Sequence, residues 1–163
     1  MSSSPLRAKV LTVSDGVMAG TREDRSGEAL TAALEGGGFR VVERSVIADG
    51  VASVAGELTR LSASFAGLVV TTGGTGFSPR DQTPEGTREI LEREAPGLAE
   101  AMRSIGAQSN PYSWLSRGIA GLKGTTLIVN LPGSLRGATE SLASIVELLK
   151  HGLEVAAGSQ RHP

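Results

Sequence analysis

The stretch of sequence that decides the fold is AGLVVTTGGTGFSPRDQTPE, which runs from Ala66 to Glu85. It begins with a short apolar run rich in β-branched residues and stops at Thr-Thr-Gly-Gly-Thr-Gly. This pattern predicts a buried strand and then a loop whose backbone can approach a ligand. Arg80 and Asp81 follow the glycines, after which Thr83 suits a helix N-cap and Pro84 the first helical position. The stretch therefore predicts a strand, a glycine loop, a charged pair and a helix start, in this order.

Strand and helix patterns alternate on the N-terminal side of this stretch. Strands are expected at residues 6–13 and 39–47, helices at residues 26–36 and 54–61, and a long polar loop at residues 14–27. Strands that alternate with helices imply a largely parallel sheet with right-handed crossovers and helices on both faces. We therefore predict an α/β fold with a mostly parallel sheet.

Further helices and a hairpin are predicted on the C-terminal side. The expected helices run through residues 84–91, 98–105 and 138–149, and the expected hairpin strands, joined at Lys123–Gly124, are residues 118–122 and 125–131. The hairpin would add an antiparallel element, and Ser134 would cap the last helix. Residues 108–117 show no clear pattern, so a helical turn and an irregular excursion both stay open. Residues 1–5 and 158–163 are expected to be disordered tails of a single domain spanning residues 1–163.

Composition excludes several classes of protein. The chain has 163 residues and no cysteine, which excludes disulfides, thiolate zinc ligands and a cysteine nucleophile. Sixteen basic and seventeen acidic residues leave a net charge of −1, which gives no electrostatic case for a nucleic-acid binder. No apolar segment approaches the roughly 20 residues of a membrane helix, and the first five residues lack the features of a secretory signal. We therefore expect a cytoplasmic protein that binds neither nucleic acid nor a membrane.

Four of the predicted loops leave the carboxyl ends of strands, where ligands collect in open α/β sheets. They begin at Ser14, Asp49, Gly73 and Pro132. Together they offer backbone N–H groups and hydroxyls for phosphate oxygens, and carboxylates for Mg²⁺. They can therefore form one pocket for a phosphorylated ligand.

Each of these features also has a structural interpretation. The glycine loop completes neither a Walker A motif nor Gly-x-Gly-x-x-Gly, so a phosphate cradle and a plain turn both stay open. Asp15, Asp49 and Asp81 can be turn or helix-cap residues, and Arg80 can hold phosphate or pair with a carboxylate. The two histidines lie near the C-terminus, outside these loops, and no Ser/His/Asp arrangement is evident.

Six motifs, taken together, resemble the Mog/MoaB family of molybdenum-cofactor biosynthesis proteins. They are TVSD at residues 12–15, DRSG at 24–27, TTGGTG at 71–76, PRDQTPE at 79–85, SRGIAG at 116–121 and NLPGS at 130–134. The resemblance runs from about Leu6 to His151. It implies a three-layer α/β/α sandwich and a homo-oligomer, either a trimer or a hexamer made of two trimers.

The resemblance also implies a reaction, in which molybdopterin and Mg-ATP give adenylyl-molybdopterin and pyrophosphate. Asp49 and Asp81 match the family's functional carboxylates, which would hold Mg²⁺. The family commonly has proline before the first of these, where this chain has Ala48. Further substrate-binding residues that the resemblance implies are Ser14, Asp15, Thr72, Gly73, Gly74, Thr75, Gly76, Arg80, Pro132, Gly133 and Ser134.

Two alternatives remain within the same family. One is a MoaB-type protein that binds pterin or nucleotide without a transferase step, and the other is an assembly scaffold of the same pathway. The presence of both Asp49 and Asp81 favours the enzyme. Its product would then be handed to a molybdenum-insertion protein.

Overall fold

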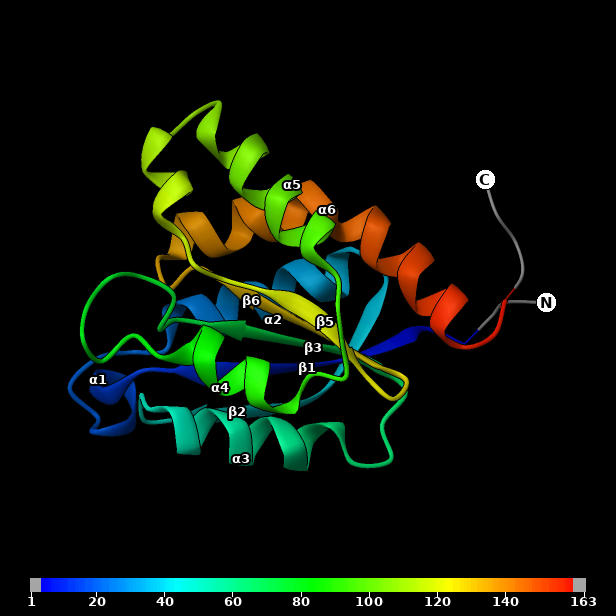
Figure 1. Cartoon of the computed structure of the whole chain (residues 1–163), viewed down its shortest axis with the longest axis horizontal. Coiled ribbons are helices and arrows are strands. Elements are labelled where there is room, and N and C mark those ends of the chain that lie inside the picture. Colours follow the sequence, from blue (N-terminus) through cyan, green and yellow to red (C-terminus); the bar gives the residue numbers. More distant parts are fainter. Residues whose placement is uncertain (1–3, 160–163) are drawn as a thin grey trace.

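The computed structural model of the protein describes residues 4–159 and shows one mixed sheet (Figure 1). The sheet has six strands in the order β2-β1-β3-β6-β5-β4. The strands are β1 (Leu6–Val13), β2 (Phe39–Ile47), β3 (Gly67–Thr72), β4 (Arg93–Glu94), β5 (Ala120–Lys123) and β6 (Thr126–Leu131). Strands β2, β1, β3 and β6 are parallel neighbours, whereas β5 is antiparallel to both β6 and β4. The predicted hairpin is thus confirmed.

Helices cover both faces of the sheet, as predicted (Figure 1). One layer contains α2 (Arg25–Gly36), α5 (Pro96–Ala107) and α6 (Leu135–Ala156), and the other contains α3 (Val51–Ser62) and α4 (Thr83–Ile90). Two short elements complete the described chain: α1 (Asp15–Met18) follows β1, and the 3₁₀ helix η1 (Pro111–Leu115) follows α5. The fold is therefore a three-layer α/β/α sandwich, as the family resemblance implies.

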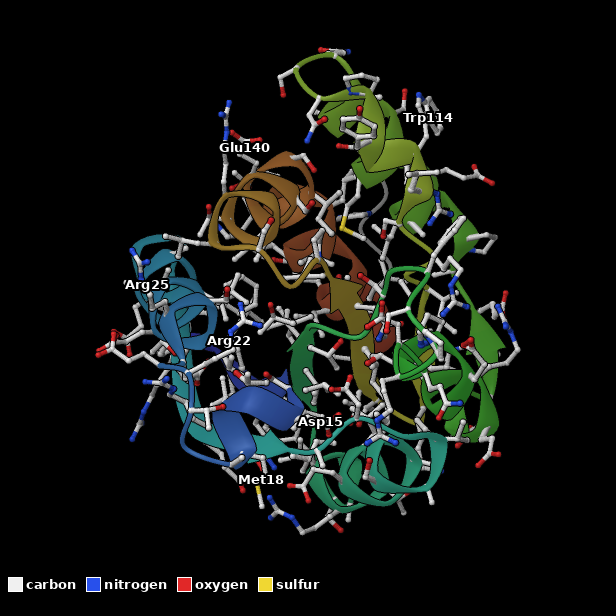
Figure 2. All side chains as sticks on the ribbon, turned by 90° about the vertical axis from the view of Figure 1, so that its left-hand side faces the viewer. Asp15, Met18, Arg22, Arg25, Trp114 and Glu140 are labelled. Atoms are coloured by element: carbon white, nitrogen blue, oxygen red, sulfur yellow. The ribbon has the colours of Figure 1, made fainter. Side chains whose placement is uncertain are left out.

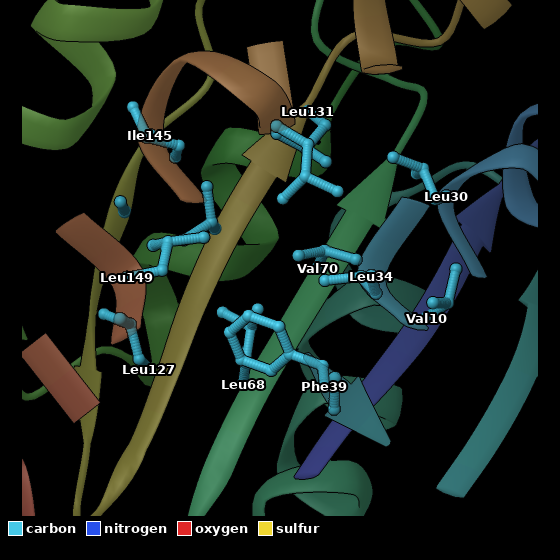
Figure 3. Packing of buried hydrophobic residues seen from close by; sticks show 14 of the residues in the cluster. Val10, Leu30, Leu34, Phe39, Leu68, Val70, Leu127, Leu131, Ile145 and Leu149 are labelled. Atoms are coloured by element: carbon cyan, nitrogen blue, oxygen red, sulfur yellow. The ribbon is translucent and has the colours of Figure 1, made fainter. Parts of the chain in front are cut away.

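The central strand β3 is buried on both faces, and its side chains alternate between the two cores. Leu68 and Val70 pack with α2 and α6, while Val69 packs with α3. Figure 3 shows Leu68 and Val70 among the side chains of the larger core, which include Leu149 of α6. This double burial explains why the strand is a continuous apolar run in the sequence rather than an alternating one.

The structure corrects several predicted boundaries. The N-cap of α4 is Gln82, and Thr83 is the first helical residue. The Thr83 side chain is buried and donates a hydrogen bond to the Gly73 carbonyl (Oγ1···O 2.9 Å) instead of capping the helix. The helix ends at Ile90, and the two-residue strand β4, too short to give a periodic pattern, follows it. The hairpin turn falls at residues 124–125.

The structure also defines two segments whose conformation the sequence pattern left open. The long loop after β1 contains the single turn of α1, which Ser14 caps by accepting a hydrogen bond from Val17 N at 3.2 Å. Helix α2 begins at Arg25, one residue earlier than predicted. The segment at 108–117 contains η1, so the helical turn is the correct alternative. Of the predicted tails, residues 1–3 and 160–163 lie outside the described residues.

Candidate active site

The loops at the carboxyl ends of β1, β2, β3 and β6 meet at one edge of the sheet, the edge that faces the viewer in Figure 2. They line a cleft of about 600 Å³. The predicted site residues that line this cleft are Ser14, Asp49, Thr72, Gly73, Gly74, Asp81, Gly133 and Ser134. The predicted convergence of separate loops on one pocket is thus confirmed for these residues.

The glycine loop is shaped by contacts that leave no room for side chains. Gly73 and Gly74 have φ angles of 102° and 68°, which favour glycine. A Cβ atom at Gly73 would lie 2.2 Å from the Val13 carbonyl oxygen, and one at Gly74 would lie 2.1 Å from Thr83 Oγ1. The loop is therefore packed tightly between the end of β1 and the start of α4.

The loop after β6 is joined to the glycine loop. The Thr72 hydroxyl donates to the Pro132 carbonyl (Oγ1···O 2.7 Å), and Gly73 N donates to the Leu131 carbonyl at 3.3 Å. A Cβ at Gly133 would lie 3.2 Å from the Gly73 Cα. Ser134 then caps α6 by accepting a hydrogen bond from Gly137 N at 3.1 Å, as predicted. The two loops therefore form one continuous wall.

Asp49 and Asp81 lie against this wall from different loops. Asp49 Oδ1 is 3.1 Å from the position of a Cβ at Gly74, and Asp81 Oδ2 is 2.8 Å from that of a Cβ at Gly76. Asp81 Oδ2 also accepts a hydrogen bond from Ser78 N at 3.0 Å, which closes the turn after the glycines. The structure thus brings together two carboxylates from loops that follow different strands.

Two predicted site residues, Asp15 and Arg80, line neither the cleft nor a second cavity of the structure, and they pair with each other beside Asp49. Arg80 Nε and Nη2 each donate to one carboxylate oxygen of Asp15 at 3.0 Å, and Nη2 also donates to the Asp49 carbonyl at 2.9 Å. Asp15 and Asp49 exchange hydrogen bonds, from Asp15 N to Asp49 Oδ2 at 3.0 Å and from Asp49 N to Asp15 Oδ1 at 3.1 Å. The sequence left open whether Arg80 holds phosphate or pairs with a carboxylate, and in the structure it pairs with the carboxylate of Asp15.

The carboxylates of Asp15 and Asp49 differ in electrostatic environment. Hydrogen bonds from the Arg80 guanidinium are the main cause that lowers the pKa of Asp15. The pKa of Asp49 is raised, first by burial and further by the negative charges of Asp15 and Asp81. A cation bound beside Asp49 would therefore relieve an unfavourable concentration of negative charge.

The cleft also contains cations that no carboxylate engages. Arg22 and Arg25 line it, and neither forms an ion pair within the described residues 4–159. Figure 2 shows Arg22 extending over the open centre of this face. By contrast, Asp24 beside them accepts hydrogen bonds from Thr12 Oγ1, Gly27 N and Arg44 Nη2 at 2.8–3.1 Å. Arg22 and Arg25 can therefore pair with an anionic ligand.

A second cavity, of about 470 Å³, lies on the other side of the wall. It is bounded by α5, η1 and the first turns of α6, and Ser134 lines both cavities. Predicted residues Thr75, Gly76 and Pro132 line this cavity and not the cleft. Its lining includes the helical residues Ala99, Met102, Tyr112, Leu115 and Ser141, and Ser116 directly after η1.

Sequence reasoning missed this second cavity and the contacts of Arg117, whose guanidinium donates to the Gly76 and Asp81 carbonyls. The residues of the cavity come from helices whose facing sides cannot be read from their own periodicity. The available signals were the Asn-Pro-Tyr turn at 110–112 and the SRGIAG motif, which contains Ser116 and Arg117.

Within the described residues, the structure contains no group of three or more His, Cys, Asp or Glu side chains able to hold a metal ion by themselves. Nor does any helix there have the length and hydropathy to cross a membrane.

Comparison with known proteins agrees with the fold and with these loops. The family model described as "Probable molybdopterin binding domain" matches residues 9–151. The chain is 33% identical over 153 residues to the molybdopterin adenylyltransferase of Helicobacter pylori strain J99, covering 92% of this chain and 87% of that protein. It is 34% identical over 152 residues to the molybdenum cofactor biosynthesis bifunctional protein of Synechococcus elongatus, covering 93% of this chain and 48% of that protein.

A solved structure gives the same result. The molybdopterin biosynthesis enzyme MoaB of Thermus thermophilus superposes with a TM-score of 0.86 at 46% identity, covering 94% of this chain and 98% of that one. The chain thus belongs to the family of probable molybdopterin binding domains, as its motifs indicate. It spans about half or less of the length of several longer curated relatives.

Proposed function

We propose that the protein is a molybdopterin adenylyltransferase, which converts molybdopterin and Mg-ATP to adenylyl-molybdopterin and pyrophosphate. The observation that carries this proposal is the pair of adjoining cavities, which share Ser134 and lie on opposite sides of the glycine loop. A reaction that joins two phosphorylated heterocycles through their phosphates needs two such cavities with a common boundary. The name of the H. pylori relative, of which the chain covers 87%, supports the same reaction.

The cleft suits the triphosphate and its metal ion. Mg²⁺ commonly binds one or two carboxylates together with substrate phosphates and water, so Asp49 and Asp81 would suffice without a third protein ligand. The raised pKa of Asp49 is compatible with this assignment, because burial, and to a smaller extent the charges of Asp15 and Asp81, disfavour a carboxylate that has no cation beside it. When bound, Mg²⁺ would neutralise charge on the phosphates and on the departing pyrophosphate. Arg22 and Arg25 would bind the remaining phosphate oxygens.

The second cavity suits the pterin ring system. Its wall combines the apolar side chains of Ala99, Met102 and Leu115 with the hydroxyls of Ser116 and Ser141. Such a lining can hold a flat heterocycle and hydrogen-bond its edge. The backbone amides of Thr75 and Gly76, at the boundary, would then bind the terminal phosphate of molybdopterin.

The chemical step requires positioning more than proton transfer. An oxygen of the molybdopterin phosphate forms a bond to the α-phosphorus of ATP, and the bond from that phosphorus to the bridging oxygen breaks as pyrophosphate leaves. Because the attacking phosphate is already anionic near neutral pH, no general base is needed. Holding both phosphates at the glycine loop would supply most of the rate enhancement.

We also propose the wider setting that the family resemblance implies. The protein would work in the cytoplasm as a single-domain subunit of a homotrimer or of a hexamer, and would pass its product to a molybdenum-insertion protein. Exposed apolar side chains such as Phe77, Trp114 and Leu148 are available for contacts between subunits or with such a partner.

The proposed reaction is tested by incubating the purified protein with molybdopterin and Mg-ATP. We expect adenylyl-molybdopterin and pyrophosphate to appear in equal amounts, and omission of Mg²⁺ to stop both. Binding of both substrates without either product, under conditions in which an active relative turns over, would contradict the proposal. That result would favour the non-catalytic binding protein.

A further inference from the structure

Arg117 lines neither cavity itself but contacts a residue of each, Gly76 of the second cavity and Asp81 of the cleft. Its neighbours Ser116 and Gly118 line the second cavity, and its own backbone N–H donates to the Thr75 carbonyl at 2.9 Å. Its guanidinium contacts the segment from Gly76 to Asp81, where Nε donates to the Gly76 carbonyl at 2.8 Å and Nη2 to the Asp81 carbonyl at 2.7 Å. One residue therefore holds both ends of the segment that carries Asp81.

The same guanidinium is anchored to α4. Nη1 pairs with the Glu85 carboxylate, at 2.5 Å from Oε1 and 3.2 Å from Oε2. Glu85 lies in the first turn of the helix that follows the loop. Arg117 thus ties the glycine loop, the Asp81 turn and the start of α4 to the segment that leads into β5.

The Asp81 carboxylate has little freedom to move relative to the glycine loop. A Cβ at Gly76 would be only 2.8 Å from Asp81 Oδ2, so the carboxylate packs directly on the Gly76 backbone. Further contacts hold the base of this loop, where Thr83 N donates to the Gly74 carbonyl at 3.0 Å, and its tip, where Asp81 N donates to the Ser78 carbonyl at 2.9 Å and Ser78 N to Asp81 Oδ2 at 3.0 Å. Arg117 is what joins Gly76 to Asp81 across the opening between base and tip.

Arginine suits this role because its planar guanidinium presents several donors in a fixed fork. Lysine keeps the charge but cannot reach three acceptors in different directions. The side chains of Arg117 and Glu85 are 36% and 40% exposed, so they are not part of the hydrophobic core. Substitution at either position therefore leaves the packing of the sheet and helices intact.

We propose that Arg117 is a positioning residue for the proposed adenylyl transfer, which sets the Asp81 carboxylate relative to the Thr75–Gly76 backbone. This inference rests on the proposed function. It assigns to Arg117 no contact with either substrate. Substitution of Arg117 should change kcat and the Mg²⁺ concentration needed for half-maximal activity, because Asp81 would hold the metal ion. It should change the KM for ATP little, because other residues would bind the nucleotide.

The test compares Arg117→Lys and Glu85→Gln with Arg88→Lys as the matched control. Arg88 lies on α4 and pairs with an exposed carboxylate, that of Glu94, at 3.0 Å, and within the described residues no hydrogen bond joins its side chain to the glycine loop or to the Asp81 turn. We expect Arg117→Lys to lower kcat by about 10- to 100-fold, because a displacement on the order of 1 Å has effects of that size. KM for ATP should change less than about twofold, and half-maximal activity should need several times more Mg²⁺. Glu85→Gln should give the same pattern in weaker form, and Arg88→Lys should match the wild type.

A second readout does not depend on catalysis. Amide hydrogen exchange at residues 76–81, without substrates, should be at least about tenfold faster in Arg117→Lys and unchanged in Arg88→Lys. If the wild type makes product but a folded Arg117→Lys protein keeps its kcat and Mg²⁺ requirement, the inference is wrong. If the wild type makes no product, the proposed reaction fails, and unchanged exchange at residues 76–81 would then overturn the positioning role as well.

Discussion

The cleft and the second cavity share a wall, but they are built from different parts of the fold. The cleft is formed by loops that leave four parallel strands, and it gathers Asp49, Asp81, Arg22 and Arg25. The second cavity is formed by helices α5 and α6 and by η1. Its two arginines are already engaged, since Arg103 donates to the Ser116 and Gly118 carbonyls and Arg136 pairs with Glu140. Free charge is thus concentrated on one side of the glycine loop.

This difference indicates a division of work between the two sides. Loops at strand ends can bring charged groups from distant segments within a few ångströms of a phosphate. Helix faces supply an extended, mostly uncharged surface that suits a ring. We therefore expect substitutions in the cleft to change turnover, and substitutions in the second cavity to change the binding of a single substrate.

The largest effect is expected for Asp81→Asn in the cleft. In the proposed reaction Asp81 would hold Mg²⁺, so loss of its charge should lower kcat by roughly 10²- to 10³-fold, while KM for ATP changes far less. Product formation at saturating substrate measures this. Glu89→Gln removes a carboxylate from the exposed side of α4 and should have no effect. Formation of adenylyl-molybdopterin by Asp81→Asn at the wild-type rate would refute the assignment of the cleft.

The next effect concerns the wall itself. Gly73→Ala would force a φ of 102° on alanine and place its Cβ 2.2 Å from the Val13 carbonyl oxygen. We expect a loss of roughly 1–3 kcal/mol in the free energy of unfolding, together with reduced turnover. Chemical denaturation measures the first quantity. In the control, Gly56→Ala at an exposed position of α3, the added Cβ meets nothing within 4 Å and should stabilise the helix by about 0.5–1 kcal/mol. Equal stability changes in the two variants would contradict the tight packing of the wall.

Filling the second cavity tests the other side of the comparison. Ser141→Phe would place a ring in the cavity from α6 and should raise KM for molybdopterin by about tenfold, the equivalent of about 1.4 kcal/mol of binding, while KM for ATP stays the same. Ala143→Phe, on the exposed side of the same helix, should change neither KM. An increase in KM for ATP alone would show that the two substrates are assigned to the wrong cavities.

The smallest effect is a difference in pH dependence between Asp49, which lines the cleft, and Asp15 beside it. Because the pKa of Asp49 is raised in the fold, its contribution to stability is present below the ordinary value of 3.8 and is lost as the pH rises through the folded pKa. Asp49→Asn should therefore keep or slightly raise the melting temperature at pH 7, by a few degrees at most. The difference in melting temperature between Asp49→Asn and the wild type should close as the pH falls below about 3.8. Calorimetry at pH 7 and below that value can check this.

Asp15 provides the matched comparison, because its pKa is lowered by Arg80. Its contribution to stability is present above the unfolded pKa and is lost as the pH falls through the folded one. Asp15→Asn should therefore lower the melting temperature at pH 7. A similar loss in Asp49→Asn would contradict the electrostatic difference between these two residues.

Much of the fold, and the convergence of loops that forms the cleft, could be predicted from local patterns, whereas the second cavity could not. The strand at residues 66–72 and its glycine loop were evident because a fully buried strand has a continuous apolar run, which turn-forming residues must interrupt. Asp49 and Asp81 were proposed as functional carboxylates because their motifs resemble those of the Mog/MoaB family, whereas their local pattern left a turn or helix-cap role open. By contrast, the two-residue strand β4 is too short for any period to appear, and η1 follows an Asn-Pro turn with several allowed outcomes.

The strand and its glycine loop were thus determined by the sequence alone, since an apolar run and the glycines that end it depend on near neighbours in the chain, while the roles of Asp49 and Asp81 stay predictions from the family motifs. Only the tertiary structure decided that Arg80 pairs with Asp15, 65 residues away, and that Arg117 holds the Asp81 turn from 36 residues away. It also decided that α5, η1 and α6 enclose a cavity behind the loop. The physical reason is that a guanidinium or a helix face has several possible partners, and only the packing of distant segments selects one.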